Sequence, residues 1–259
     1  MSEPEETHTE PFPRGARTQT LSDRIGDRLI VAIAIGEYLP GVQLSPEREL
    51  AAALGVGRVT VRAAIARLVD LGLLQKRRGR NGGTFVIGSD AVRAEPEIAQ
   101  VLEAARAQLL DQYEAESWMH GAVAAAAAQR HTGSDRQALL LRLEEFRAAG
   151  SGPEAQAADE LLHETIARAA RSPALRDSLL ALERRIHVRA PLHPWGTEAT
   201  WQDMERRALR DHERLVEAIL ARDVAAAHEI GRLHARINIE HIEAVHVQIR
   251  TDADRARTA

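Results

Sequence analysis

Within residues 44–87 the spacing of apolar residues changes from a helical to a strand-like period. Apolar side chains first recur every three or four positions in two short blocks, as expected for the buried faces of two helices. The blocks are Leu50, Ala51 and Leu54, followed by Val61, Ile65 and Leu68. Gly55 lies between them and can adopt the positive φ of a tight corner, and Ser45 is expected to cap the first helix. Residues 73–87 then form two short strand-like runs around a glycine-rich turn at 79–83. The pattern predicts a helix-turn-helix followed by a β-hairpin.

The polar positions of the second predicted helix form a surface that suits DNA. Arg58, Thr60 and Arg62 lie near its N-terminal end, away from the apolar stripe. The N-terminal end of a recognition helix enters the major groove, where arginine binds guanine or phosphate and threonine can contact a phosphate or a thymine methyl group. We therefore expect these three side chains to face a DNA duplex.

The predicted hairpin is strongly basic. Lys76, Arg77, Arg78 and Arg80 place cations along its edge, where they suit backbone phosphates and, for Arg80, the minor groove. Taken alone, the arginines are also typical of a solvent-exposed helix face without a DNA partner, and the glycine-rich turn is typical of any β-hairpin. Their ordered occurrence within one short stretch favours double-stranded DNA as the partner.

Residues 98–248 keep the helical period throughout and lack strand-like alternation. Ala, Leu, Glu and Arg dominate, and Gly and Pro lie at the borders of the helical blocks. The predicted helices cover 97–110, 112–131, 135–149, 154–170, 173–189, 198–221 and 223–248. The expected fold is mainly α, with an N-terminal winged helix-turn-helix and a C-terminal all-α helical bundle.

Composition divides the chain into five segments. We expect a disordered N-terminal arm at 1–18, a winged helix-turn-helix domain at 19–88 and a linker at 89–97. An all-α domain at 98–248 and a disordered tail at 249–259 follow. The net charge is −4, but basic residues outnumber acidic ones between 19 and 87, so the local field there favours DNA.

Two absences in the sequence narrow the class of protein. Without cysteine, the chain has no disulfide, no thiolate metal site and no cysteine nucleophile. It also lacks an apolar run long enough to span a bilayer, and its N-terminus is acidic. A cytoplasmic protein without a membrane partner is therefore expected.

Four residues of the helical region are candidate metal ligands. Asp159 and His163 lie four positions apart, so both project from one face of a helix, while His212 and His234 lie on the last two predicted helices. Imidazole and carboxylate suit a divalent metal, zinc first and also nickel, manganese or iron. Because the chain has 11 histidines, chance spacings of solvated or hydrogen-bonded histidines explain the pattern better than a metal site at this point.

The first third of the chain resembles the winged helix-turn-helix of the GntR family, through the blocks PERELAAALGVGRVTVRAAIARL and GRNGGTFV. The resemblance implies operator contacts from Arg48, Arg58, Thr60 and Arg62, and a close approach of the DNA backbone to Gly82 and Gly83. Two departures stand out. Gly57 replaces a serine that usually contacts phosphate, and Ser45-Pro46 replaces the order Pro-Ser.

The helical region resembles the FCD effector domain of FadR-subfamily GntR regulators, through ADELLHETIARAARSPAL, RDHERLVEAILARD and AAAHEIGRLHARI. This resemblance implies a metal bound by Asp159, His163, His212 and His234, a small-molecule effector with a carboxylate, and a homodimer. One departure bears on the effector. Glu116 and His120 occupy the positions where family members commonly carry an arginine and a glutamate, so an arginine that would bind an acid is missing.

Together these features predict a ligand-responsive transcriptional regulator, not an enzyme. We expect a repressor that binds a palindromic operator as a homodimer. Two other classes remain: a metal-dependent hydrolase, and an architectural DNA-binding protein that needs no ligand. The metalloprotease signature fails twice, because Ala167 and Arg232 stand where a second histidine is required.

Overall fold

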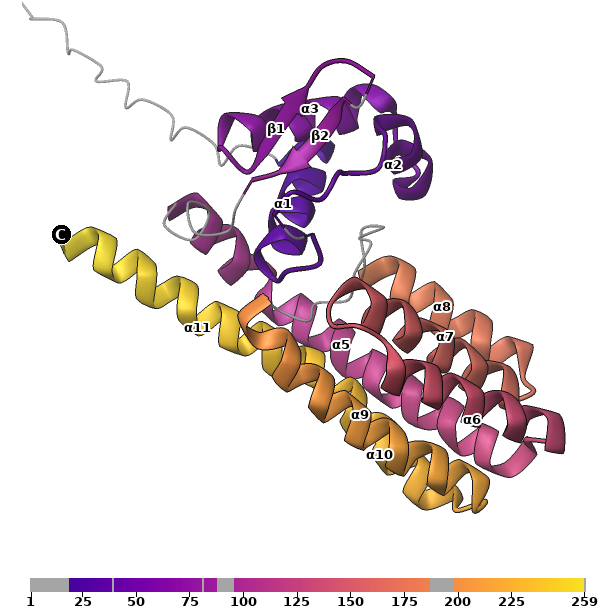
Figure 1. Cartoon of the computed structure of the whole chain (residues 1–259). Helices are drawn as coiled ribbons and strands as arrows, with labels where there is room; N and C mark the ends of the chain where they lie inside the picture. The colour runs from indigo at the N-terminus through magenta and orange to yellow at the C-terminus, as the bar shows by residue number, and fades with distance from the viewer. Residues whose placement is uncertain (1–18, 39, 81, 88–95, 187–197, 259) are drawn as a thin grey trace, which may run out of the picture.

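A computed structural model describes residues 19–38, 40–80, 82–87, 96–186 and 198–258. The expected arm at 1–18 and all but the end of the expected linker at 89–97 lie outside the described residues. Figure 1 shows a small winged module above one end of a long helical bundle. Among the described helices, none combines the length and the hydropathy needed to cross a lipid bilayer.

The winged module follows the predicted order and adds one helix in front of it. It consists of α1 (Leu21–Ala34), α2 (Glu47–Leu54), α3 (Arg58–Asp70), β1 (Leu74–Arg77) and β2 (Gly83–Val86). The two strands pair antiparallel, with Leu74 opposite Val86 and Arg77 opposite Gly83. The apolar positions predicted to be buried in α3, Val61, Ile65 and Leu68, are at most 1% exposed.

Helix α2 ends as predicted but begins differently. Gly55 at its C-terminal end has φ 65° and ψ 33°, the left-handed conformation that glycine adopts without strain. Ser45 does not cap α2, because Pro46 occupies the N-cap position and, within the described structure, no side chain bonds to the free amides there. The sequence pattern did not predict α1, although Thr20 and Asp23 form a capping box at its start.

The bundle contains seven described helices. They are α5 (Pro96–Arg130), α6 (Gly133–Ala148), α7 (Pro153–Ala169), α8 (Pro173–Ile186), α9 (Glu198–Leu220), α10 (Val224–Ala235) and α11 (Ile237–Thr258). The helices expected at 97–110 and 112–131 are one continuous helix, α5. The helix expected at 223–248 is divided at Arg236 into α10 and α11.

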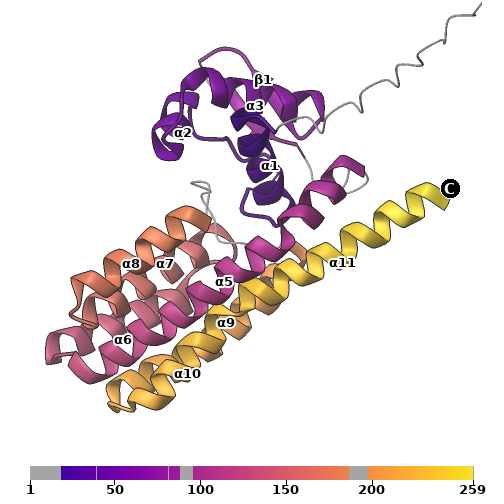
Figure 2. The same ribbon diagram turned by 180° about the vertical axis from the view of Figure 1, so that it is seen from behind.

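The expected disordered tail at 249–259 was wrong, because α11 continues to Thr258. Figure 2 shows α11 running along α5 and projecting past the body of the bundle. Ile242, Val245 and Ile249 follow the helical period and are 3%, 8% and 1% exposed. They belong to an apolar core that also contains residues of the winged module, so burial of this stripe extends along α11 as far as Ile249.

The winged module and the bundle share that core. Ile98, Leu102 and Tyr113 of α5 pack into it together with residues of α1 and α3. Two polar contacts cross the junction. The Tyr113 hydroxyl donates to Glu37 Oε1 at 3.2 Å, and His241 Nε2 lies 2.8 Å from the carbonyl oxygen of Ile35.

The buried end of α11 gives a stability prediction. Replacing Ile249→Ala should lower the free energy of unfolding by about 2–4 kcal/mol, because it removes apolar volume from a closed core. Val247→Ala is the matched control, since Val247 is 63% exposed and its replacement should cost less than about 0.5 kcal/mol. Urea unfolding followed by far-ultraviolet circular dichroism measures both. Equal effects of the two changes would contradict the packing of α11.

Candidate metal centre and DNA-reading surface

The exposed face of α3 carries the residues that sequence analysis assigned to DNA. Arg58 and Arg62 are exposed, and Thr60 is half-buried beside them. Gly57 is the N-cap of α3 and offers no side chain to the first amides of the helix. Those amides therefore remain available to an anion such as phosphate. Arg48 lies exposed on α2.

Glu47 at the start of α2 organises part of this surface. Its Oε2 accepts a hydrogen bond from Arg62 Nε at 3.0 Å, and its Oε1 lies 3.9 Å from Lys76 Nζ. The carboxylate thus joins a cation of α3 to a cation of β1. A phosphate that binds either cation must compete with Glu47.

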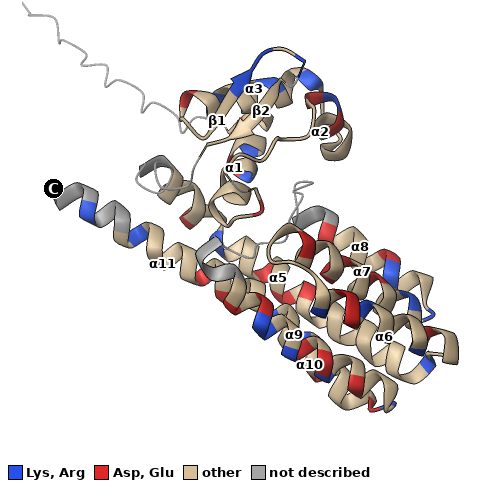
Figure 3. Cartoon of the chain, viewed as in Figure 1, with Lys and Arg blue, Asp and Glu red and all other residues tan. Residues whose placement is uncertain are grey.

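The hairpin brings a row of cations to one edge of the winged module. Figure 3 shows Lys and Arg along β1 and the loop that follows it. Arg77 packs over the ring of Phe85, with its guanidinium carbon 4.4 Å from the ring centroid. Arg78 and Arg80 are exposed in the turn. This edge is therefore a basic surface next to the exposed face of α3.

Gly82 and Gly83 of the hairpin lie in close contact with neighbouring groups of the winged module. A Cβ added to Gly82 would lie 2.6 Å from the Arg77 carbonyl oxygen. One added to Gly83 would lie 2.1 Å from Gln43 Nε2, whose amide donates to the Gly82 carbonyl at 3.2 Å. The turn therefore requires glycine at position 82 whether or not DNA approaches it, and the contacts of both glycines with DNA stay a prediction.

The four candidate metal ligands lie together in the bundle. Asp159 and His163 come from α7, His212 from α9 and His234 from α10. The Nε2 atoms of the three histidines form a triangle with sides of 3.1, 3.3 and 3.3 Å. Asp159 Oδ1 lies 3.2 Å from His212 Nε2 and 3.7 Å from His163 Nε2. We call these four residues the metal cluster.

The donors of the metal cluster fit one divalent ion. Adjacent ligands at about 2.0–2.1 Å from a common ion, as for zinc and nitrogen, are roughly 2.8–3.4 Å apart at the angles of tetrahedral or octahedral geometry. The three nitrogen separations fall in this range. Three imidazoles and one carboxylate are also the donor types that zinc and its neighbours among the transition metals prefer.

Burial keeps the imidazoles of His163 and His234 in the form that binds a metal. It holds the pKa of His163 well below its usual value and lowers the pKa of His234, and the neighbouring histidines lower both further. Neutral imidazole has a free nitrogen lone pair, so no proton has to be displaced at neutral pH. His212 is fully buried, and its ring meets Phe146 edge to face, with centroids 4.7 Å apart.

Sequence analysis missed Asp211 as a neighbour of the metal cluster. Asp211 Oδ2 lies 3.6 Å from His234 Nδ1, the ring nitrogen that points away from the other histidines. Burial alone would raise the pKa of Asp211, but the contact with His234 holds it below its usual value. A carboxylate in this position orients a ligating imidazole. The Asp-His pair at 211–212 in the sequence was the available signal.

Glu116 and His120, the departures noted in the sequence, lie beside the metal cluster. His120 Nε2 is 3.8 Å from Glu116 Oε1 and 3.8 Å from Glu183 Oε1 of α8. Burial lowers the pKa of His120, but the two glutamates outweigh that effect and raise it above its usual value. Glu183 is a second residue that sequence analysis did not single out.

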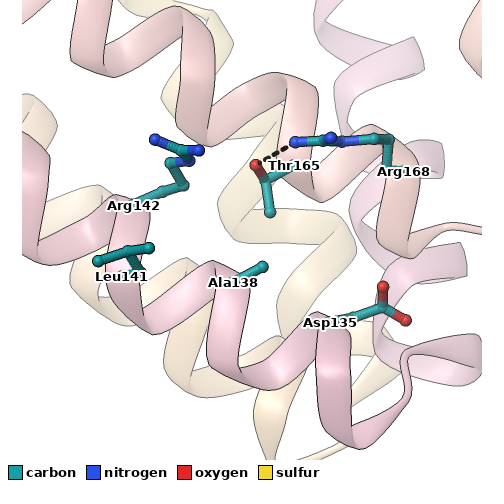
Figure 4. Close-up of a pocket in the computed structure, with 6 residues that line it drawn as sticks. All are labelled: Asp135, Ala138, Leu141, Arg142, Thr165 and Arg168. Carbon is teal, nitrogen blue, oxygen red and sulfur yellow. Dashed lines mark hydrogen bonds between the residues drawn. The ribbon is translucent and has the colours of Figure 1, made fainter.

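A separate surface pocket lies between α6 and α7 (Figure 4). It is lined by Asp135, Ala138, Leu141, Arg142, Thr165 and Arg168. Its polar groups are bonded within the protein. Arg168 donates to the Thr165 hydroxyl at 3.1 Å, and Asp135 pairs with Arg171 at 3.3 Å. The pocket shares no residue with the metal cluster.

Comparison with known proteins agrees with this architecture. The model of bacterial regulatory proteins of the gntR family matches residues 21–86, and the FCD domain model matches residues 111–237. One relative, "Putative HTH-type transcriptional regulator RmpR" of Mycobacterium gastri, is 33% identical over 229 residues, covering 85% of this chain and 80% of the relative. Another, "Putative L-lactate dehydrogenase operon regulatory protein" of Escherichia coli strain K12, is 29% identical over 256 residues, covering 92% and 90%.

Among solved structures, Streptococcus agalactiae GntR is similar with a TM-score of 0.42 and 24% identity, over 84% of this chain and 98% of that one. The relatives named above are described as transcriptional and operon regulators. The matched domains correspond to the winged module and to the bundle that contains the metal cluster. The chain therefore belongs to the GntR family of transcriptional regulators, with a DNA-binding domain followed by an FCD-type effector domain.

Proposed function

We propose that this chain is a metal-dependent, metabolite-responsive repressor that binds a palindromic operator as a homodimer. The observation that supports the metal is the convergence of four ligand side chains from three helices, with imidazole nitrogens 3.1–3.3 Å apart. Asp159, His163, His212 and His234 would hold the ion. When bound, it supplies a Lewis-acidic centre with room for water or for a carboxylate oxygen of the effector.

The small DNA-contacting surface of each winged module is the reason for proposing a dimer. Each winged module offers the few side chains of α3 and the basic edge of the hairpin, which support only a small number of base contacts. Two modules related by a two-fold axis double those contacts and match an inverted repeat. Helical domains that pair about this axis would set the spacing of the two modules.

Helix α5 would transmit the effect of effector binding to the DNA-binding domain. Tyr113, Glu116 and His120 lie at helical spacing on this helix. His120 borders the metal cluster, whereas the Tyr113 hydroxyl bonds to Glu37 of the winged module. A shift of α5 on effector binding would therefore act directly on the junction between the domains, and would change the spacing of the two reading surfaces. Release from the operator follows.

Arg58 provides a test of the DNA-binding surface. Arg58→Ala should weaken binding to the operator by about 1–3 kcal/mol, because it removes an exposed cation at the N-terminal end of the recognition helix. Fluorescence anisotropy with operator fragments from the chain's own genome measures the change. Arg136→Ala, at an exposed arginine of α6, is the matched control and should leave affinity unchanged. Equal affinity of both variants and the wild type would remove Arg58 from the interface.

Glu47 gives a prediction of opposite sign. Glu47→Gln releases Arg62 and Lys76 from a carboxylate that competes with phosphate, so binding to unrelated duplexes should strengthen several-fold and should depend more steeply on salt. Titration of a scrambled duplex at several salt concentrations measures both effects. Unchanged affinity and salt slope would show that Glu47 does not restrain these cations.

The metal cluster is tested by metal content. Asp159→Asn and His212→Ala should each weaken zinc binding by at least about tenfold, because each removes a direct ligand. Elemental analysis after dialysis against a zinc buffer measures the loss, and circular dichroism checks the fold. His228→Ala is the control, since His228 of α10 packs near Trp118 and lies outside the metal cluster. Wild-type zinc content in both ligand variants would refute the site.

A further inference from the structure

Glu116, His120 and Glu183 form a second cluster of ionisable side chains, which we call the carboxylate cluster. His120 is its centre, 3.8 Å from a carboxylate oxygen of each glutamate. The His120 ring also meets the edge of the His163 ring, with centroids 5.2 Å apart and planes at 77°. The carboxylate cluster therefore borders the metal cluster through His163.

The less buried side of the metal cluster faces the carboxylate cluster. The side chains of His212 and His234 are 0% and 7% exposed, whereas His163 keeps 20%. His120 and Glu183, which continue from His163, keep 15% and 25%. A molecule that approaches the metal from this side passes His120 and Glu183 first.

The spacing of the carboxylate cluster differs from that of the metal cluster. Its ligand atoms lie within 4.8 Å of one another, and His120 is 3.8 Å from each carboxylate, compared with 3.1–3.3 Å among the metal-cluster nitrogens. Two adjacent ligands of one transition-metal ion are roughly 2.8–3.4 Å apart. Two acceptors of one ammonium group, each about 2.9 Å from its nitrogen, are roughly 4.7 Å apart. The wider spacing suits an ammonium group better than a second metal ion.

The charge of the carboxylate cluster also favours an ammonium group as its ligand. Glu116 and Glu183 bring two negative charges to the less buried side of the metal cluster, and even a protonated His120 would balance only one of them. A second carboxylate on the effector would be repelled here, whereas an ammonium group would be attracted. A carboxylate of the effector is still needed as a partner for the metal.

From this arrangement we propose that the effector is an amino acid or a similar amino carboxylate, with its carboxylate on the metal and its ammonium group on Glu116 and Glu183. The inference rests on the proposed function, since it assigns the effector class of that same site. It also explains why Glu116 stands where the resemblance leads one to expect an arginine: the position accepts the positive end of the ligand, not its negative end.

Calorimetry with the full-length, zinc-loaded protein tests the proposal with three matched pairs of ligands. The pairs are L-alanine and L-lactate, β-alanine and 3-hydroxypropionate, and 4-aminobutyrate and 4-hydroxybutyrate. Each pair exchanges an ammonium group for a hydroxyl at constant chain length. At least one amino member should bind about tenfold tighter than its hydroxy partner, as expected for a charge-assisted hydrogen bond at a partly buried site.

The variant Glu183→Gln should remove most of this preference while leaving the affinity for the hydroxy acid within about threefold, because the amide keeps the shape and loses the charge. Glu217→Gln, at an exposed glutamate of α9, is the control and should keep the preference. Zinc content should stay at one ion per chain in the wild type and in both variants.

The outcomes separate this proposal from the proposed function. Hydroxy acids that bind as tightly as amino acids at every length, or a preference that survives Glu183→Gln, would overturn the amino-carboxylate proposal and leave a metal-dependent regulator intact. A second zinc ion that is lost in Glu183→Gln would also overturn it, since the carboxylate cluster would then be a metal site. Failure of both ligand series to bind the zinc-loaded chain would overturn the amino-carboxylate proposal, whereas a wild-type chain that retains no zinc after dialysis would refute the metal site of the proposed function.

Discussion

The close approach of α5 and α10 is the contact on which the effector domain depends. A Cβ added to Gly231 of α10 would lie 3.0 Å from the Ala124 Cβ and 3.2 Å from the His120 carbonyl oxygen, and one added to Gly121 would lie 2.8 Å from a carbonyl oxygen of α10. The two helices therefore meet backbone to backbone, which only glycine and alanine permit. This crossing places His234 one turn beyond Gly231 and brings it to the same depth as the ligands of α7 and α9. It also places His120 of α5 beside them, so one packing constraint positions both the metal cluster and its neighbour.

A second constraint joins this centre to the DNA-binding domain. Helix α5 begins in the core of the winged module and ends deep in the bundle, so both domains pack against one rigid element. Glu37 and Tyr113 are 2% and 0% exposed at the junction, and burial together with the charge of Glu37 raises the pKa of Tyr113 well above its usual value. The phenol therefore keeps its proton and remains a donor to Glu37. Burying the Glu37 carboxylate without its hydrogen-bond donors costs free energy. The junction therefore favours one register of α5 against α1 over positions in between.

Local spacing explains which parts of this arrangement could be predicted from the sequence. The helix-turn-helix and hairpin follow from apolar periods within single elements, and Asp159 and His163 share a face because they are one helical turn apart. The partnership of these two residues with His234 could be inferred only through resemblance, because no spacing rule reports how separate helices cross. Glu183 was missed for the same reason. The last helix was predicted only as far as residue 248, because the polar residues after Ile249 suggested a frayed end, whereas α11 continues to Thr258.

The uneven distribution of charge explains how a chain with a negative net charge can contain a DNA-binding domain. The net charge of −4 would oppose a duplex if it acted uniformly, but screening at physiological salt limits each charge to a range of roughly 8 Å. In the proposed function, DNA therefore meets the cations of α3 and the hairpin, not the acidic bundle. Within that surface Glu47 holds Arg62 and Lys76 in place, while Arg58 has no ion pair with any described residue. A cation that is held by a carboxylate loses less conformational entropy when it binds DNA. It must, however, exchange that carboxylate for a phosphate. It therefore contributes less to the binding of arbitrary DNA sequences than an unpaired cation does. Pairing part of the basic surface internally thus favours discrimination between sites over raw affinity.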